Sequence, residues 1–349
     1  MKTLLSLSLL TVSLVVGVLL AELVVRVGFP AYHPAGSVAF QRTADGVPLA
    51  SPGFVGRQWK NTGDYDVPIR INRHGLRDGK DLVRAGPHDW FVVGDSFTFG
   101  HGVREEERFS NLLQDFLAEP VYNLGIPTDI DGYARLLNHA RARGAAPQRL
   151  LVAICMENDL LDYHREQPAV LPVLAAPRWR LGALKARFTR SSALYNLATT
   201  AIHRTPPLRD LAIRLGLLRP NLAGMPGPAR EAAVQSSAAR LSMLLEAQSL
   251  EVAAVVLIPS RGLWAGPERE AHATVHRRFK AALEKHGIRV IDLRAAFEAS
   301  GKPLSLHFDN DGHWNPAGHL RAARVIHDRL RAWGWTRGVA RAGSQVQTR

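Results

Sequence analysis

Five short apolar runs separated by amphipathic segments are the feature that most limits how this chain can fold. The runs cover residues 90–93, 121–124, 150–155, 252–258 and 288–291, and apolar residues recur at helical spacing over 109–117, 133–142, 229–247, 268–285 and 316–333. Strands that alternate with helices form parallel sheets with helices on both faces. We therefore predict a three-layer α/β/α fold around a mainly parallel five-stranded sheet.

The first apolar run ends in Gly94-Asp95-Ser96, and the acidic run Glu105-Glu106-Glu107 is expected to begin the next helix. This order places Ser96 where a buried strand stops, at the edge of the sheet where open α/β folds bind ligands. Its backbone N–H is then available to a developing oxyanion. The same triplet also occurs in simple turns with a capping serine, so the assignment depends on partners elsewhere in the chain.

Such partners lie far downstream, in Asp311-Gly312-His313. A serine nucleophile needs a base within hydrogen-bond reach and a carboxylate that orients this base. His313 is expected to take the proton of Ser96 and to return it to the leaving alcohol, while Asp311 holds the imidazole. Other histidines and acids of this region fit the spacing less well; they are His307, His319 and Asp309.

These motifs resemble those of the SGNH, or GDSL-type, hydrolases. Gly94-Asp95-Ser96 resembles the first block of that family, Asn123-Leu124-Gly125 lies in the second, Glu157-Asn158-Asp159 resembles the third, and Asp311 with His313 the last. The resemblance runs from about residue 69 to about residue 330 and is closest to membrane-anchored bacterial members, which share the lead-in at 71–77. It implies a flavodoxin-like sheet and a catalytic triad of Ser96, His313 and Asp311.

The resemblance also implies an oxyanion hole made by the Ser96 N–H, the Asn158 side chain and a backbone N–H from the second block. Asn158 is alternatively a turn residue that ends the third strand. Counted from Asn123, the oxyanion glycine of the family falls on Thr128, whereas the nearest glycine, Gly125, comes three residues early. A backbone N–H does not require glycine, so Thr128 and Gly125 are both candidates. Loss of one such donor typically raises the barrier by about 2.7–4 kcal/mol.

The N-terminal region, residues 1–28, is almost wholly apolar from residue 3 to residue 25, with Glu22 and Arg26 near its end. About 20 apolar residues suffice to cross a bilayer, and no clear small-residue cleavage site follows. We therefore predict a retained membrane anchor rather than a cleaved signal peptide. Lys2 and Arg26 nearly balance, so charge leaves the orientation open. The family resemblance places the catalytic part outside the cytoplasm, in the periplasm.

Three other regions flank or interrupt the expected catalytic domain at 87–336. Residues 29–86 are expected to form a lead-in with short strands and turns, including one strand at 66–72. Its basic residues Arg73, His74 and Arg77 either pin the lead-in to the domain or bind an anion. Residues 160–228 form a basic insertion, with helices expected at 181–202 and 208–218, that lies on an anionic membrane, receives an acidic glycan or simply caps the domain. Residues 337–349 predict a flexible basic tail.

The net charge of +13 favours acidic partners such as anionic lipids or glycans. Zinc-finger spacing, aromatic RNA-binding motifs and recognition helices are missing from the sequence, so nucleic acid is not an expected partner. Asp309, Asp311 and His313 alternate like metal ligands, but no second cluster completes a shell, and we expect neither a metal nor another cofactor. The single cysteine, Cys155, excludes an intramolecular disulfide.

Three functions fit this sequence. The first is a serine esterase that removes an acyl group, with acetyl favoured, from a glycan or a small ester. The second is an O-acyltransferase that passes the same acyl group to a hydroxyl of an envelope or exported polysaccharide. The third is a non-catalytic glycan-binding protein, against which the intact Ser96, Asn158, Asp311 and His313 argue. We favour hydrolysis, and the substrate, the acyl length and the oligomeric state stay open.

Overall fold

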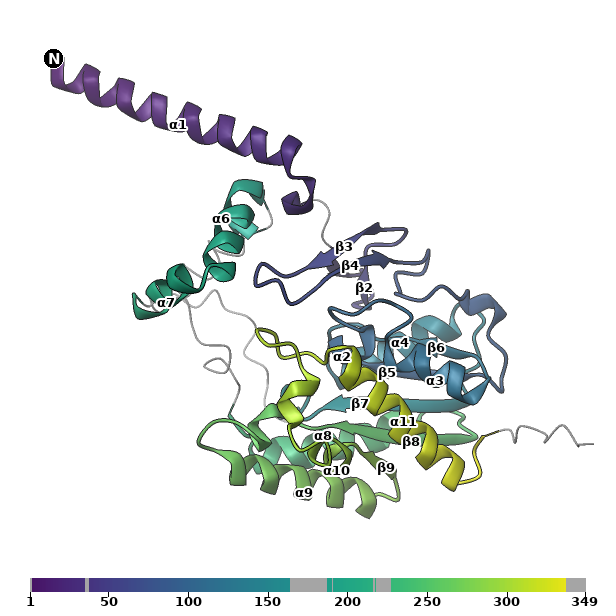
Figure 1. Cartoon of the computed structure of the whole chain (residues 1–349). Coiled ribbons are helices and arrows are strands. Elements are labelled where there is room, and N and C mark those ends of the chain that lie inside the picture. The colour runs from purple at the N-terminus through teal and green to yellow at the C-terminus, as the bar shows by residue number, and fades with distance from the viewer. Residues whose placement is uncertain are drawn as a thin grey trace, which may run out of the picture.

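The computed structural model describes residues 2–34, 38–163, 187–189, 191–215, 217 and 227–336. An α/β body carries a long N-terminal helix, α1 (Lys2–Gly28), that projects away from it (Figure 1). Within α1, Ser6–Gly28 has a mean hydropathy of 2.4 and is long and apolar enough to cross a membrane or to act as a signal sequence.

The body is built on one five-stranded sheet with the strand order β6-β5-β7-β8-β9. Its strands are β5 (Trp90–Gly94), β6 (Val121–Asn123), β7 (Arg149–Cys155), β8 (Val252–Ile258) and β9 (Arg289–Asp292), and every pairing is parallel. The prediction of a mainly parallel five-stranded sheet is confirmed. Because the chain leaves β5 for β6 on one side and continues through β7 on the other, the end of β5 is a topological switch point, where such sheets bind ligands.

Helices cover both faces of this sheet, because its strands are apolar on both sides. One face packs against α4 (Ile130–Arg141), α8 (Glu231–Glu246) and α9 (Arg269–Lys285), with Phe91, Val152 and Leu257 pointing toward them. The other face packs against α3 (Phe109–Leu117), α10 (Arg294–Glu298) and α11 (Pro316–Ala332), with Val92 and Val256 on that side. The three-layer prediction is therefore confirmed.

Short elements complete the connections. They are α2 (Ser96–Phe99) after β5, and the 3₁₀ turns η1 (Pro30–Tyr32), η3 (Leu82–Arg84), η5 (Arg261–Leu263) and η6 (Pro303–Leu306). The lead-in contributes two antiparallel hairpins, β1 (Phe40–Arg42) with β2 (Pro48–Ala50) and β3 (Val55–Trp59) with β4 (Asp66–Arg70). Ile69 and Leu49 bury the lead-in in the same core as α4, so this segment is packed onto the catalytic domain.

Two helices of the insertion are described, α6 (Ala193–Arg204) and α7 (Pro206–Arg214); α6 lies beside the C-terminal end of α1, and α7 continues from the far end of α6 (Figure 1). Against the helices predicted at 181–202 and 208–218, α6 ends at Arg204 and α7 begins at Pro206, residues 187–189 are also helical, and residues 181–186, 216 and 218 lie outside the described part of the chain. Most of the basic stretch of the insertion and the tail at 337–349 lie outside the described residues.

One local prediction is wrong: no helix begins at Glu105-Glu106-Glu107, which form turns, and α3 starts at Phe109. The cause is Arg108, whose buried side chain donates to the carbonyl of Arg77 and to Asn111 Oδ1 and so holds its backbone extended. Glu105 instead accepts the N–H of Gly79, at 2.9 Å. A tertiary contact thus overrides the local helix preference of these three acids.

Candidate active site

The candidate nucleophile lies at the switch point, where β5 turns directly into α2. Asp95 caps this short helix, because its Oδ1 accepts the N–H of Phe97 at 2.9 Å. Gly94 has to be glycine, since a Cβ there would come within 2.2 Å of Thr98 Oγ1 and 2.8 Å of the Ala153 carbonyl. Ser96 is therefore the first residue of a helix, with its N–H among those that no helical carbonyl accepts.

Ser96, His313 and Asp311 meet at this point, although more than 200 residues separate them in sequence. His313 Nε2 lies 2.8 Å from Ser96 Oγ, and His313 Nδ1 is hydrogen-bonded to Asp311 Oδ1. The N–H of His313 also donates to Asp311 Oδ1, at 3.0 Å, so the carboxylate fixes both the ring and its loop. This is the geometry in which an imidazole takes a proton from a serine and a carboxylate sets its tautomer.

The β3–β4 hairpin of the lead-in reaches the other oxygen of Asp311. Lys60 Nζ lies 2.8 Å from Asp311 Oδ2, and the Tyr65 hydroxyl donates to the same oxygen at 3.2 Å. Burial by itself raises the pKa of Asp311, but the hydrogen bond from His313 and the charge of Lys60 outweigh it and hold that pKa well below its usual range. Asp311 therefore stays ionised next to His313.

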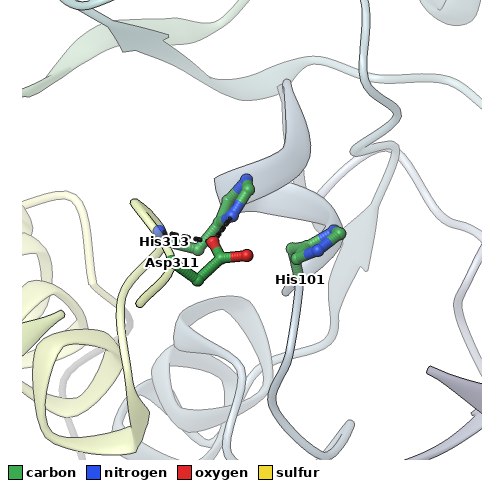
Figure 2. A group of neighbouring side chains, drawn as sticks. All are labelled: His101, Asp311 and His313. Atoms are coloured by element: carbon green, nitrogen blue, oxygen red, sulfur yellow. Dashed lines mark hydrogen bonds and ion pairs between the residues drawn. The ribbon is translucent and has the colours of Figure 1, made fainter. Parts of the chain in front are cut away.

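His101 forms a second layer against the triad. Its ring stacks on that of His313, with centroids 4.1 Å apart, and Figure 2 shows both rings next to Asp311. Burial and the proximity of His313 lower the pKa of His101 to about 3, so this ring is neutral at ordinary pH. A consistent donor chain then runs from Gln58 Nε2 to His101 Nδ1, from His101 Nε2 to the Tyr65 oxygen, and from Tyr65 to Asp311.

His101, Asp311 and His313 lie close enough, within 4.8 Å, to be considered as metal ligands. Each of their ring nitrogens and carboxylate oxygens already has a hydrogen-bond partner. The Lys60 ammonium at Asp311 would in addition repel a cation. The contacts fit a hydrogen-bonded triad better than a metal site.

A cavity of about 200 Å³ opens at Ser96. Its lining residues are Ser96, Phe97, Cys155, Glu157, Asn158, Arg261, Gly312 and His313. One wall is a bidentate ion pair, with Arg261 Nη2 at 2.5 Å from Glu157 Oε1 and Arg261 Nε at 3.1 Å from Glu157 Oε2. Both side chains are nearly buried. This wall is therefore polar, but its two opposite charges neutralise each other.

Asn158 lies on the turn that ends β7 and lines the same cavity as Ser96. Its side chain lies near the Asp95 carboxylate and partly offsets the effect of burial, which raises the pKa of Asp95. Asp159 stabilises this turn by accepting hydrogen bonds from the Tyr133 hydroxyl at 2.7 Å and from the Cys155 N–H at 2.9 Å. Burial raises the pKa of Asp159 well above its usual value, as it also raises that of Asp95.

The other two oxyanion candidates lie outside the cavity lining. The N–H of Gly125 donates to Asn123 Oδ1 at 2.9 Å, and a Cβ at Gly125 would come within 2.4 Å of the Thr98–Phe99 backbone. This glycine therefore lets the second block approach α2 closely. Thr128 precedes α4, and its side chain packs against Gly132.

The competing candidates from the sequence have other surroundings. His307 and His319 are buried, and Asp309 is exposed. Arg77, which was expected to pin the lead-in to the domain, donates to the carbonyls of Phe99, Gly100 and Val103. These residues lie at the end of α2 and in the loop that follows it. Arg73 and His74 both pair with Asp81.

Sequence reasoning missed four residues of the site: Lys60, Tyr65, His101 and Arg261. Arg261 follows β8 closely, so its place at the carboxyl edge of the sheet was a usable signal. His101 comes five residues after Ser96 in the loop that follows α2. Lys60 and Tyr65 lie in a region of poor periodicity and gave no such signal.

Comparisons with known proteins identify the family of this chain and several similar solved structures. The sequence matches the GDSL-like Lipase/Acylhydrolase family over residues 92–321. No curated protein matches the chain. A similar solved structure is the lipase/acylhydrolase from Enterococcus faecalis, with 12% identity, a TM-score of 0.41, and coverage of 70% of this chain and 96% of that chain.

Two further solved structures are similar at the same level. A member of the lipolytic protein G-D-S-L family from Veillonella parvula DSM 2008 has 11% identity and a TM-score of 0.37, covering 70% of this chain and 96% of that chain. A catalytic mutant of an acetylxylan esterase from Geobacillus stearothermophilus has 18% identity and a TM-score of 0.38, covering 73% and 99%. Because the family match spans well over half of the chain and includes Ser96, Asp311 and His313, this protein belongs to the GDSL-like lipase/acylhydrolase family.

Proposed function

We propose that this protein is a serine esterase that removes a short acyl group, acetyl above all, from a glycan or a small ester through an acyl-serine intermediate. The observation that carries the proposal is the contact of Ser96 Oγ with His313 Nε2 at 2.8 Å, with Asp311 on the far side of the ring. No metal or other cofactor is needed for this reaction, because the base and the nucleophile are both side chains.

In the first half-reaction, Ser96 Oγ attacks the ester carbonyl while His313 takes its proton. The oxyanion that forms is stabilised by the Ser96 N–H and the Asn158 amide. Collapse of this intermediate breaks the bond to the alkoxy group, which leaves with the proton from His313. Water then attacks the acyl-serine by the same route and releases the free acid.

The cavity supports a short acyl group. Its volume of about 200 Å³ also has to hold part of the alcohol, and the Arg261–Glu157 ion pair closes one side with charged atoms. A long acyl chain would have to place methylenes against this wall, which is unfavourable for apolar groups. A hydroxylated alcohol such as a sugar could hydrogen-bond there.

The test is a serine-directed phosphonate probe together with a series of acyl esters of increasing length. The probe should label Ser96 in the wild type and not in Ser96→Ala, and kcat/KM should fall steadily from acetate to octanoate. Labelling that persists in Ser96→Ala would contradict the assignment of Ser96 as the nucleophile. A preference for octanoate would instead overturn the short-acyl proposal and leave the nucleophile in place.

Acyl transfer is a second candidate, because α6 of the insertion reaches the hairpin that contacts Asp311. The Arg204 side chain lies against Gly63, at the turn of the hairpin that carries Lys60 and Tyr65. A cover held there would keep water from the acyl-serine until an acceptor hydroxyl arrives. Partitioning of an acyl donor between water and an added glycan decides this point. Acylated glycan that exceeds free acid would favour the transferase, and a release of acid that ignores the acceptor would favour the esterase.

We further propose that α1 is retained as a membrane anchor, with the catalytic domain on the periplasmic side. Support comes from its last turns, which pack on the folded protein: Val25 is buried, and Glu22 and Arg26 contact the insertion. Fractionation should find the full-length chain in membranes after a high-salt wash. A mature soluble form that begins after α1 would contradict retention, and protection from protease added to spheroplasts would contradict the orientation.

A further inference from the structure

We propose that α7 lies on the membrane surface beside the anchor and inserts one leucine stripe among the lipids of an anionic leaflet. This inference rests on the proposed anchoring by α1 and adds a second, peripheral membrane contact to it. Three observations carry it: the attachment of α6 to α1, the composition of the exposed face of α7, and the direction in which the two helices leave α1.

The attachment is a helix cap supplied by the anchor itself. Glu22 Oε2 accepts the Ser192 hydroxyl at 2.8 Å and the Leu194 N–H at 2.9 Å, and Glu22 Oε1 accepts the Ala193 N–H at 2.9 Å. Arg26 binds Glu22 Oε1 at 2.7 Å and the carbonyl of Ser191 at 2.6 Å. A carboxylate at the N-terminus of a helix is favoured by the free N–H groups and by the helix dipole.

This cap also fixes the level of α6 along α1. Glu22 lies six residues before the end of the apolar helix at Gly28, which is about 9 Å along its axis. An acid this close to lipid is costly unless it is paired, and here its oxygens are satisfied by Arg26 and by the start of α6. The first turn of α6 is thereby held close to the end of the anchor, within about 9 Å of the end of its apolar span.

The exposed face of α7 has the composition of an interfacial helix. Leu208 and Leu211 of α7 and Leu215, which directly follows it, are 46%, 52% and 64% exposed, and their spacing places them within one stripe. Arg209 and Arg214 are on the same element, together with a single acid, Asp210. Apolar residues on one stripe with flanking arginines are typical of helices that lie in the headgroup region of anionic membranes.

The direction of the helices agrees with this placement. Only Thr205 separates α6 from α7, so α7 begins at the same depth relative to the bilayer at which α6 ends. In Figure 1 the pair leads away from the C-terminal end of α1 and runs across the axis of α1 rather than along it. A bilayer crossed by α1 would therefore lie alongside α7.

Spin labels on single cysteines test the proposal in the full-length protein, reconstituted into vesicles of phosphatidylglycerol and phosphatidylethanolamine. The native Cys155 is buried and would be replaced by alanine. Labels at Leu211→Cys, at Asp210→Cys and at Leu14→Cys in α1 then report accessibility to oxygen, which concentrates in lipid, and to a water-soluble nickel chelate. We expect the label at 211 to favour oxygen and the label at 210 to favour nickel, with 14 deepest.

The outcomes separate the two proposals. Labels at 211 and 210 that are equally accessible to nickel, with 14 still deep, would overturn the surface contact and leave the anchor. A label at 211 that neither reagent reaches would place α7 against protein instead and also overturn it. A label at 14 that nickel reaches would show that the anchoring itself fails. Glu22→Ala provides a second measurement: loss of the cap should reduce the oxygen accessibility at 211 several-fold.

Discussion

Replacing His319 by glutamine should make the protein less sensitive to acid. His319 is fully buried in α11, where its Nδ1 accepts the N–H of Phe109 at 3.3 Å and its ring packs against Phe109 and Trp314. Burial, aided by the nearby charges of Arg108 and Arg77, lowers the pKa of this histidine to about 3. Glutamine can keep the acceptor for Phe109 but cannot titrate.

The expected size of the effect follows from proton linkage. The ring has a pKa of 6.5 in the unfolded chain and about 3 in the folded one, so between these values only the unfolded chain binds the proton. The contribution of the neutral His319 ring to the free energy of unfolding is therefore fully present above pH 6.5. It decreases as the pH falls, until the folded protein also binds the proton near pH 3. Between pH 7 and pH 5 the loss amounts to about 2 kcal/mol in the free energy of unfolding.

The assay is urea unfolding in detergent micelles, followed by tryptophan fluorescence at pH 7 and pH 5. The decrease in unfolding free energy between the two pH values should be about 2 kcal/mol smaller in His319→Gln than in the wild type, whatever the absolute stability of the variant. His286→Gln changes an exposed histidine after α9 and should leave the decrease unchanged. An equal decrease in His319→Gln and the wild type would refute the argument that burial keeps this ring neutral.

Two further predictions concern Asp311. Asp311→Asn should lower kcat by about 10³–10⁴-fold because an amide would impose the wrong tautomer on His313, whereas Asp309→Asn, at an exposed position, should change it by less than about threefold; the reverse order in steady-state kinetics would exchange the two roles. Lys60→Met should lower kcat by about tenfold with little change in KM, since it leaves the buried carboxylate short of a partner, and Lys60→Arg should recover most of the loss. Equal kcat values for Lys60→Met and Lys60→Arg would mean that the charge of Lys60 does not matter.

The sheet and the triad could be predicted because their signals are local. Each strand is a short apolar run, and Ser96 and Asn158 both follow directly on such a run. The two residues His313 and Asp311 are close in sequence, so only one long-range contact had to be assumed. A serine at a strand end and a histidine in a distant loop then meet as a consequence of the parallel topology.

The remaining features depend on tertiary contacts that leave no periodic trace. Lys60 and Tyr65 reach Asp311 only because β3 and β4 pair and pack on the domain, and the expectation for that region was limited to short strands. Glu22 looks like a polar interruption at the end of an apolar segment, and only the position of α6 turns it into a cap. The helix expected at Glu105 does not form because the buried side chain of Arg108 binds the carbonyl of Arg77, which lies 31 residues earlier in the sequence.

The β3–β4 hairpin has a consequence for where this enzyme can be divided. Residues 29–86 lie outside the expected catalytic domain at 87–336 and before the family match at residue 92, so a soluble version designed from either boundary would omit them. Such a truncated protein would keep Ser96 and His313 but lose the ammonium and the phenol that hold Asp311 Oδ2. Its carboxylate would then keep the two donors from His313 and lose the two from the hairpin. The smallest active unit therefore begins upstream of Val55, and weak activity in a shorter protein would reflect the cut rather than the wrong substrate.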